Sequence, residues 1–157
     1  MYKKSATEGT ELTLISNGKA LCVIVVPDAP SSAAEEGAKI LSDHLLQISG
    51  SEVEIVKESG LEGALIQDGK ITVPARNDIQ TFILVGEGNF TQRLGITSEN
   101  LGPGGIIIKT SGNALILMGP DEKTPSDPWG TGYAVTQFLE DYLGVRYLWP
   151  GESGKVV

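Results

Sequence analysis

Apolar residues in the first part of the chain fall into short runs, and turn-forming residues separate the runs. The pattern predicts a first strand over 12–15, a tight turn at Asn17-Gly18 and a second strand over 20–26. Because the second run is apolar on both of its alternating faces, we expect it to lie in the middle of a sheet.

The next segment has the spacing of a helix with one apolar stripe. Ser32 and Glu35 are spaced as a capping box, and Gly50 is the expected stop. The stripe comprises Ala34, Ala38, Leu41, Leu45 and Ile48. Val53 and Ile55 then predict a strand reached by a crossover, so we expect a right-handed β-α-β unit with parallel strands.

The second half of the chain predicts more strands and a second long helix. Strand-like runs occur at 64–66, 71–73, 81–85, 106–108 and 114–118. Asp68-Gly69 marks a hairpin between the first two, and 111–113 marks one between the last two, with both arms largely buried. A short helix is expected at 90–94. Helical spacing of apolar residues predicts the long helix over 131–143, ahead of a strand-like stretch at 145–150.

Composition and charge narrow the classes of protein. The chain has 157 residues, 40% of them apolar and 20% charged, which fits one folded domain rather than a disordered segment. Its 20 glycines follow no period. The formal net charge is −8, and the only guanidinium groups are those of Arg76, Arg93 and Arg146, so we expect no nucleic-acid partner. No apolar run approaches the roughly 18 residues of a membrane span, so no membrane span is expected.

The chain lacks the residues that a zinc site or a catalytic triad needs. Cys22 is the single cysteine and His44 the single histidine, so an internal disulfide, a zinc site and a Ser-His-Asp triad are not expected, and neither is a cofactor. Cys22 is interpreted as a small buried side chain and His44 as a structural or surface residue. Glu140 and Asp141 are adjacent on a helix, which points them about 100° apart, so they do not form an acid/base pair.

Two glycine motifs invite comparison with phosphate-binding loops. Gly86-Glu87-Gly88 lies between a strand and a helix, but the third glycine of a dinucleotide fingerprint is missing and the following helix is short. We therefore expect a plain strand exit. Gly130-Thr131-Gly132 opens the second long helix after an acidic loop, where the glycines are expected to let the helix pack closely on the sheet.

Four segments together resemble a known family. They are Val-Pro-Asp-Ala-Pro at 26–30, Ile-Leu-Val-Gly-Glu at 83–87, Gly-Pro-Gly-Gly-Ile-Ile-Ile at 102–108, and the long closing segment from Gly130 to Glu152 that ends in Tyr-Leu-Trp-Pro-Gly-Glu. This pattern resembles the N-terminal domain that precedes the catalytic barrel in α-glucuronidases, β-N-acetylhexosaminidases and related bacterial proteins. The chain departs from the pattern at Trp129, where relatives often carry a basic residue.

The resemblance implies both a fold and a role. The fold is a two-layer α/β sandwich, with a mixed sheet, two main helices on one face and a zincin-like arrangement without the metal site. The catalytic carboxylates of such enzymes belong to a TIM barrel that follows the domain, so no catalytic residue is carried over to this chain. Relatives are commonly exported, so an extracellular or periplasmic location is expected by analogy.

Residues 1–157 are therefore predicted to be a single non-catalytic accessory domain, which packs against a downstream barrel of the same polypeptide in a glycoside hydrolase. The residues expected to contact that barrel are Trp129, Tyr147, Leu148, Trp149 and Pro150. The alternative is a freestanding carbohydrate-binding module that stacks Trp129 and Trp149 on sugar rings. A small enzyme that uses the adjacent Asp121 and Glu122 is the least favoured hypothesis, because neighbouring loop carboxylates are ordinary solvated charge.

Overall fold

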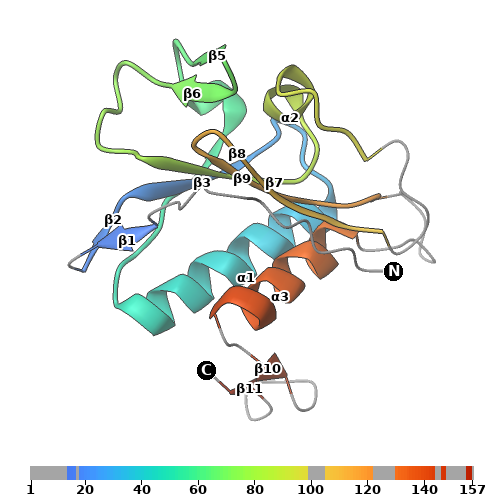
Figure 1. The fold of residues 1–157 in the computed structure, drawn as a ribbon. Coiled ribbons are helices and arrows are strands. Elements are labelled where there is room, and N and C mark those ends of the chain that lie inside the picture. The colour runs from blue at the N-terminus through green and yellow to red at the C-terminus, as the bar shows by residue number, and fades with distance from the viewer. Residues whose placement is uncertain are drawn as a thin grey trace.

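The main sheet of the protein is five-stranded and mixed, and its two long helices lie on one face (Figure 1). The computed structural model describes residues 14–16, 18–98, 105–121, 130–143, 146–147 and 155–156. The helices are α1 (Ser32–Ser49), α2 (Asn89–Arg93) and α3 (Gly130–Leu143), with a 3-10 turn at Glu58–Gly60. The strands are β1 (Ile15–Ser16), β2 (Lys19–Ala20), β3 (Cys22–Val26), β4 (Ile55–Lys57), β5 (Leu65–Gln67), β6 (Lys70–Thr72), β7 (Thr81–Val85), β8 (Ile107–Ser111), β9 (Ala114–Met118), β10 (Arg146–Tyr147) and β11 (Lys155–Val156).

The main sheet has the strand order β4-β3-β7-β9-β8. Strands β4, β3, β7 and β9 are parallel, and β8 pairs antiparallel with β9 at one edge. Ile24 of β3 lies opposite Ile55 of β4 and Ile83 of β7, which confirms that β3 is an interior strand and that α1 forms a crossover between parallel strands. The predicted mixed sheet is therefore confirmed.

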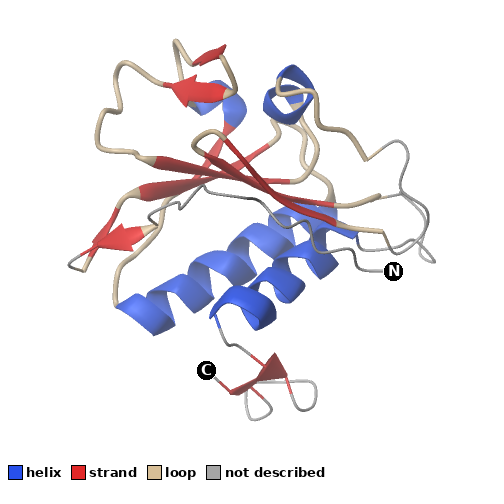
Figure 2. Cartoon of the chain, viewed as in Figure 1, coloured by secondary structure: helices blue, strands red, loops and turns tan. Residues whose placement is uncertain are grey.

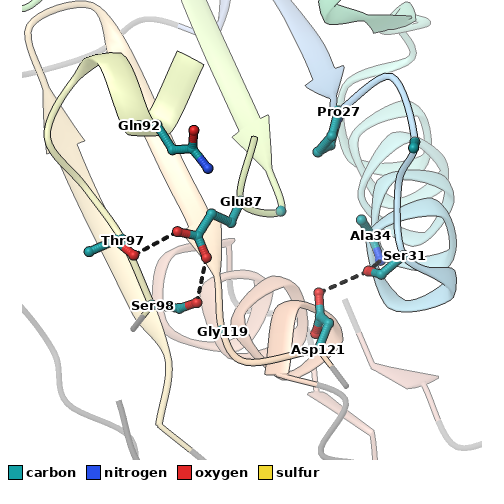
Figure 3. Close-up of a pocket in the computed structure, with 11 residues that line it drawn as sticks. Pro27, Ser31, Ala34, Glu87, Gln92, Thr97, Ser98, Gly119 and Asp121 are labelled. Carbon is teal, nitrogen blue, oxygen red and sulfur yellow. Dashed lines mark hydrogen bonds between the residues drawn. The ribbon is translucent and has the colours of Figure 1, made fainter. Parts of the chain in front are cut away.

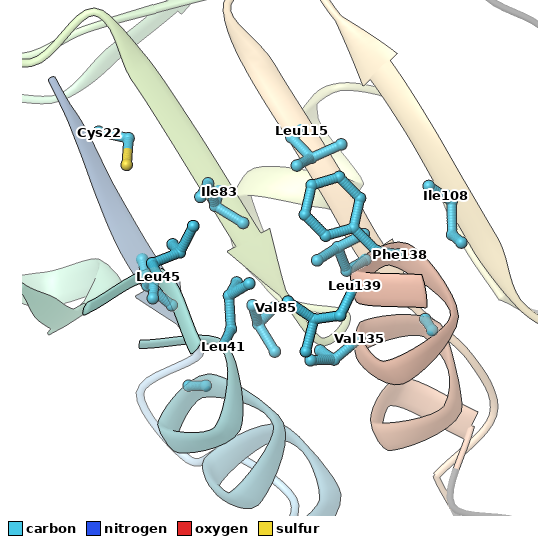
Figure 4. Close-up of a cluster of buried hydrophobic side chains, with 14 of the residues drawn as sticks. Cys22, Leu41, Leu45, Ile83, Val85, Ile108, Leu115, Val135, Phe138 and Leu139 are labelled. Atoms are coloured by element: carbon cyan, nitrogen blue, oxygen red, sulfur yellow. The ribbon is translucent and has the colours of Figure 1, made fainter. Parts of the chain in front are cut away.

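Helices α1 and α3 lie side by side on one face of this sheet (Figure 2). The core between them and the sheet contains alternate residues of β3 and β7 together with the apolar stripes of both helices (Figure 4). Leu41 of α1 and Leu139 of α3 are both fully buried there. The helices approach closely at Gly37, where a Cβ atom would lie 3.1 Å from Val135 Cγ2. The predicted arrangement of two main helices on one face is confirmed.

The opposite face of the sheet carries a second apolar core that the sequence pattern did not predict. Phe82 and Ile116 point to this side and pack with Phe90 of α2, Leu61 and Ile71. The β5–β6 hairpin and α2 cover this face (Figure 1). Because both faces are covered, all five residues of β3, β7 and β9 are buried, as expected for interior strands.

Several local predictions need correction. The side-chain cap of α1 is Ser31, whose Oγ accepts a hydrogen bond from Ala34 N at 3.0 Å, so the cap lies one residue before the predicted Ser32. The predicted strand over 20–26 is divided at Leu21 into β2 and β3. Strand β8 is a sheet edge with Lys109 exposed, so only the β9 arm of that hairpin is fully buried. Gly50 ends α1 in the left-handed conformation, as predicted.

Candidate functional site

A cleft of about 500 Å³ opens where the parallel strands β3, β7 and β9 end. In open α/β sheets, ligands bind at this carboxyl edge. The chain leaves β3 through Pro27, leaves β7 through Gly86 and leaves β9 through Gly119, and all three residues line the cleft. The beginning of α1 and the segment after α2 close its sides (Figure 3).

Asp121 lies at the base of the cleft and joins the starts of the two long helices. Its Oδ2 accepts a hydrogen bond from Ser31 Oγ at 2.9 Å, and its Oδ1 accepts one from Thr131 N at 2.8 Å. The Thr131 hydroxyl also donates to Oδ2. A carboxylate between two helix N-termini satisfies exposed N–H groups and interacts favourably with both helix dipoles. Asp121 therefore has a clear structural role.

Glu87 is the second carboxylate of the cleft, and two hydroxyl groups hold it. Thr97 Oγ1 donates to it at 2.7 Å and Ser98 Oγ at 2.6 Å (Figure 3). Partial burial acts to raise the pKa of Glu87, but the hydrogen bonds from Ser98 and Thr97 outweigh burial, and the pKa lies below its usual value. Glu87 is therefore an ionised hydrogen-bond acceptor at neutral pH and is unsuited to act as a general acid there.

The Gly86-Glu87-Gly88 segment is a strand exit, as the sequence indicated. Helix α2 has only five residues, and the Glu58 carboxylate accepts hydrogen bonds from the N–H groups of Asn89 and Phe90 at 3.2 and 2.7 Å. These are the amides that a phosphate would need in a dinucleotide site. Because a carboxylate already occupies them, this helix start repels a pyrophosphate.

The glycines at the start of α3 serve close packing, as predicted. A Cβ atom on Gly130 would lie 2.6 Å from the carbonyl carbon of Gly119 and 2.7 Å from the nitrogen and oxygen of Pro120. No side chain fits between the end of β9 and the beginning of α3. The Thr131 amide is bonded to Asp121, so this glycine motif also presents a carboxylate where a phosphate loop would present a free N–H group.

Cys22 and His44 lie in the apolar core next to the helices and not in the cleft. Burial raises the pKa of the Cys22 thiol to about 11, which keeps the thiol protonated and unreactive. His44 is 4% exposed, and its Nδ1 donates to the Ile40 carbonyl at 2.7 Å. The prediction that Cys22 is a small buried side chain is confirmed, and of the two places expected for His44 the structure shows the buried one. Within the described ranges, no three His, Cys, Asp or Glu residues are grouped so that they could hold a metal ion.

The predicted contact residues are mostly not placed by the structure. Trp129, Leu148, Trp149 and Pro150 lie outside the described residues. Tyr147 is described only as part of β10, which pairs with β11 apart from the main sheet (Figure 1). The contact surface therefore stays a prediction. Of the disfavoured Asp121–Glu122 pair, Asp121 is engaged in helix capping and Glu122 lies outside the described residues.

Comparisons with known proteins identify no family for the chain. No protein-family model matches the chain, and a search of curated proteins finds no significant match. Among the described helices, none combines the length and the apolar character needed to cross a membrane. Arguments about function therefore depend on the residues, the fold and the cleft.

Proposed function

We propose that this chain is a non-catalytic accessory domain of a glycoside hydrolase, which packs against and supports a downstream TIM-barrel catalytic domain. The observation that carries this proposal is the closing segment from Gly130 to Glu152, whose resemblance to such domains is the most specific in the sequence. The same resemblance implies a mixed sheet with two main helices on one face, and the chain has that architecture.

The chemistry of the cleft supports a non-catalytic role. A glycosidase needs two carboxylates free to exchange a proton or to attack a sugar carbon. Asp121 uses one oxygen to accept from the Thr131 amide at the start of α3 and the other to accept from the hydroxyl of Ser31, the residue that caps α1. Glu87 is held in its ionised form by Thr97 and Ser98. Both side chains serve as hydrogen-bond acceptors of the fold, and the lowered pKa of Glu87 makes that residue unsuited to act as the protonated acid.

The proposed contact with the barrel consists of aromatic and other apolar side chains. Trp129, Tyr147, Leu148, Trp149 and Pro150 are the residues that we expect to meet the next domain. Burial of one large aromatic side chain contributes on the order of 2 kcal/mol, so several together are enough to hold two domains in a fixed relation.

An activity assay tests the non-catalytic role. The purified chain is expected to show no turnover of aryl glycosides across several sugar types. Turnover that is abolished by Glu87→Gln, in a variant that keeps the circular-dichroism spectrum of the parent, would overturn the proposal. The carbohydrate-binding alternative predicts instead that oligosaccharides change the fluorescence of Trp129 and Trp149, and fluorescence that is constant at millimolar sugar contradicts it.

A further inference from the structure

The cleft at the carboxyl edge of the sheet has the dimensions of a site for a small ligand. Its volume of about 500 Å³ falls within the range of small-molecule pockets, and a monosaccharide fits within it. Its wall is formed by the ends of three parallel strands, which belong to the most buried part of the sheet. The position is therefore set by the core of the fold.

The described lining of the cleft is rich in hydrogen-bonding groups, and its charged side chains are carboxylates. Glu87, Gln92, Thr97 and Ser98 line one side, and Ser31 and Asp121 line the other (Figure 3). Among the described residues of the lining, none is basic or aromatic. Among these described residues, the two carboxylates disfavour an anionic ligand, and the lack of aromatic rings offers little to a flat apolar one.

Glu87 and Gln92 leave hydrogen-bonding capacity open to a ligand. A carboxylate has about four acceptor positions, and the hydroxyl groups of Thr97 and Ser98 and the backbone amide of Ser98 use three of them, which leaves one open. Gln92 is an exposed side chain of α2, and its amide offers two donors and one acceptor. The two protein hydroxyl groups hold the ionised carboxylate of Glu87 in position. It is therefore pre-organised to accept a hydrogen bond from a hydroxyl group of a ligand, and its charge strengthens this bond.

We propose that this cleft binds a small polyhydroxylated ligand of monosaccharide size, neutral or cationic, through Glu87 and Gln92. A hydroxyl group of the ligand donates to the open acceptor position of Glu87, and Gln92 donates to and accepts from neighbouring hydroxyls. The inference does not rest on the accessory role proposed above, because it is argued from Glu87 and Gln92, and neither is among the residues expected to contact a barrel.

Titration followed by NMR tests this proposal directly. The ¹H–¹⁵N spectrum of the full chain is recorded with D-glucose, D-glucosamine, D-glucuronate and, separately, calcium chloride. For about a dozen non-hydrogen atoms, typical ligand efficiencies give a dissociation constant of roughly 1 mM. Glucose and glucosamine are expected to shift the amide signals of Gly86, Glu87 and Ser98, whereas glucuronate is expected to bind about tenfold more weakly.

Two variants and one control assign the binding to the cleft. Glu87→Gln keeps the size and one acceptor oxygen but removes the charge, and Gln92→Ala removes an exposed side chain, so both are expected to fold. Each is expected to weaken glucose binding about tenfold or more. Glu36→Gln, a charge removal on the exposed side of α1, is expected to leave the dissociation constant unchanged.

Three results would overturn the proposal. The first is an absence of shifts in the cleft at about 10 mM neutral sugar, roughly ten times the expected dissociation constant. The second is equal binding by Glu87→Gln, Gln92→Ala and the parent chain. The third is a response to calcium or glucuronate without a response to glucose, which would identify a cation or anion site instead.

Discussion

Asp121 connects more parts of the fold than any other single side chain of the cleft. Ser31, which it binds, caps α1, and Thr131 belongs to the first turn of α3. Ser31 and Asp121 are 90 positions apart in the chain. Because α1 and α3 pack together on the same face of the sheet, fixing both helix starts also fixes how the two helices enter the core.

Replacement of Asp121 by alanine is expected to lower the free energy of unfolding by about 2 kcal/mol. The variant removes acceptors at two helix starts, and the loss of one cap costs about 1 kcal/mol. Asp43→Ala is the control, since Asp43 is exposed on α1, and its effect should stay within about 0.5 kcal/mol. Urea unfolding of both variants measures the difference. Equal stabilities for the two variants would contradict the capping role.

Glu87 is expected to make stability depend on pH in the acid range. Its pKa is lower in the folded chain than its ordinary value, so its contribution is complete above the unfolded pKa of about 4.3 and is lost as pH falls through the folded pKa. The stability gap between the parent and Glu87→Gln should therefore be largest near neutral pH and shrink at acid pH. Urea unfolding at several pH values measures it, and a gap independent of pH would refute the assignment.

At the scale of elements, Asn113 holds the β5–β6 hairpin against the main sheet. Its side-chain oxygen accepts from Ile71 N at 2.9 Å, and its nitrogen donates to Ile71 O at 2.8 Å. The amide thus pairs with β6 as a neighbouring strand would. The hairpin covers the second apolar core, to which Ile71 itself belongs. One side chain in the β8–β9 turn therefore adds polar bonds to the apolar contacts that attach this two-stranded unit.

Asn113→Ala is expected to destabilise the chain by about 2 kcal/mol, because both backbone groups of Ile71 lose their partner. Asn77→Ala changes an exposed asparagine of the neighbouring loop and is the matched control. Hydrogen exchange should show faster exchange of the Ile71 amide in the first variant only. If Ile71 remained as protected as in the parent chain, the attachment would have to come from the apolar contacts alone.

The close contact between the end of β9 and the start of α3 predicts that Gly130 cannot be replaced without a loss of stability. Gly130→Ala places a methyl group less than 3 Å from backbone atoms of Gly119 and Pro120, so we expect a loss of about 2 kcal/mol or more. Gly60→Ala is the control, because its Cβ would meet nothing within 4 Å. Thermal unfolding should separate the two variants clearly. A similar melting temperature for both would argue against the close approach.

The sequence predicted most elements because their signals are local. The run over 81–85 is apolar at every position, as a strand buried on both faces requires, and Asp68-Gly69 forms the predicted hairpin with both residues at positive φ. The cap of α1 was misplaced by one residue, since Ser31 and Ser32 are both good caps. The division at Leu21 has no marker in the pattern of apolar residues.

The cleft could not be predicted, because it depends on contacts between distant segments. Ser31, Glu87 and Asp121 follow three different strands, and only the sheet order β3-β7-β9 brings them to one edge. The sequence did show that polar residues follow each buried strand, which was the one usable signal. The sequence did not predict the second apolar core for a similar reason. Helix α2 and the β5–β6 hairpin pack on that face of the sheet only in the folded structure.

At the scale of the whole molecule, we propose that a folded scaffold works together with a separate domain. The described part of the chain forms two apolar cores on either side of one sheet. The carboxylates of the cleft serve the fold and, as inferred above, a small hydroxylated ligand. We propose that the reactive groups belong to a barrel that follows in the same polypeptide.

The intact mass of the native gene product tests whether a barrel follows this domain. An antibody raised against the domain recovers the product from its natural source, and mass spectrometry measures it. The account predicts a polypeptide longer than residues 1–157 by at least the roughly 250 residues of a (β/α)₈ barrel. A native product that ends at Val157 would contradict it.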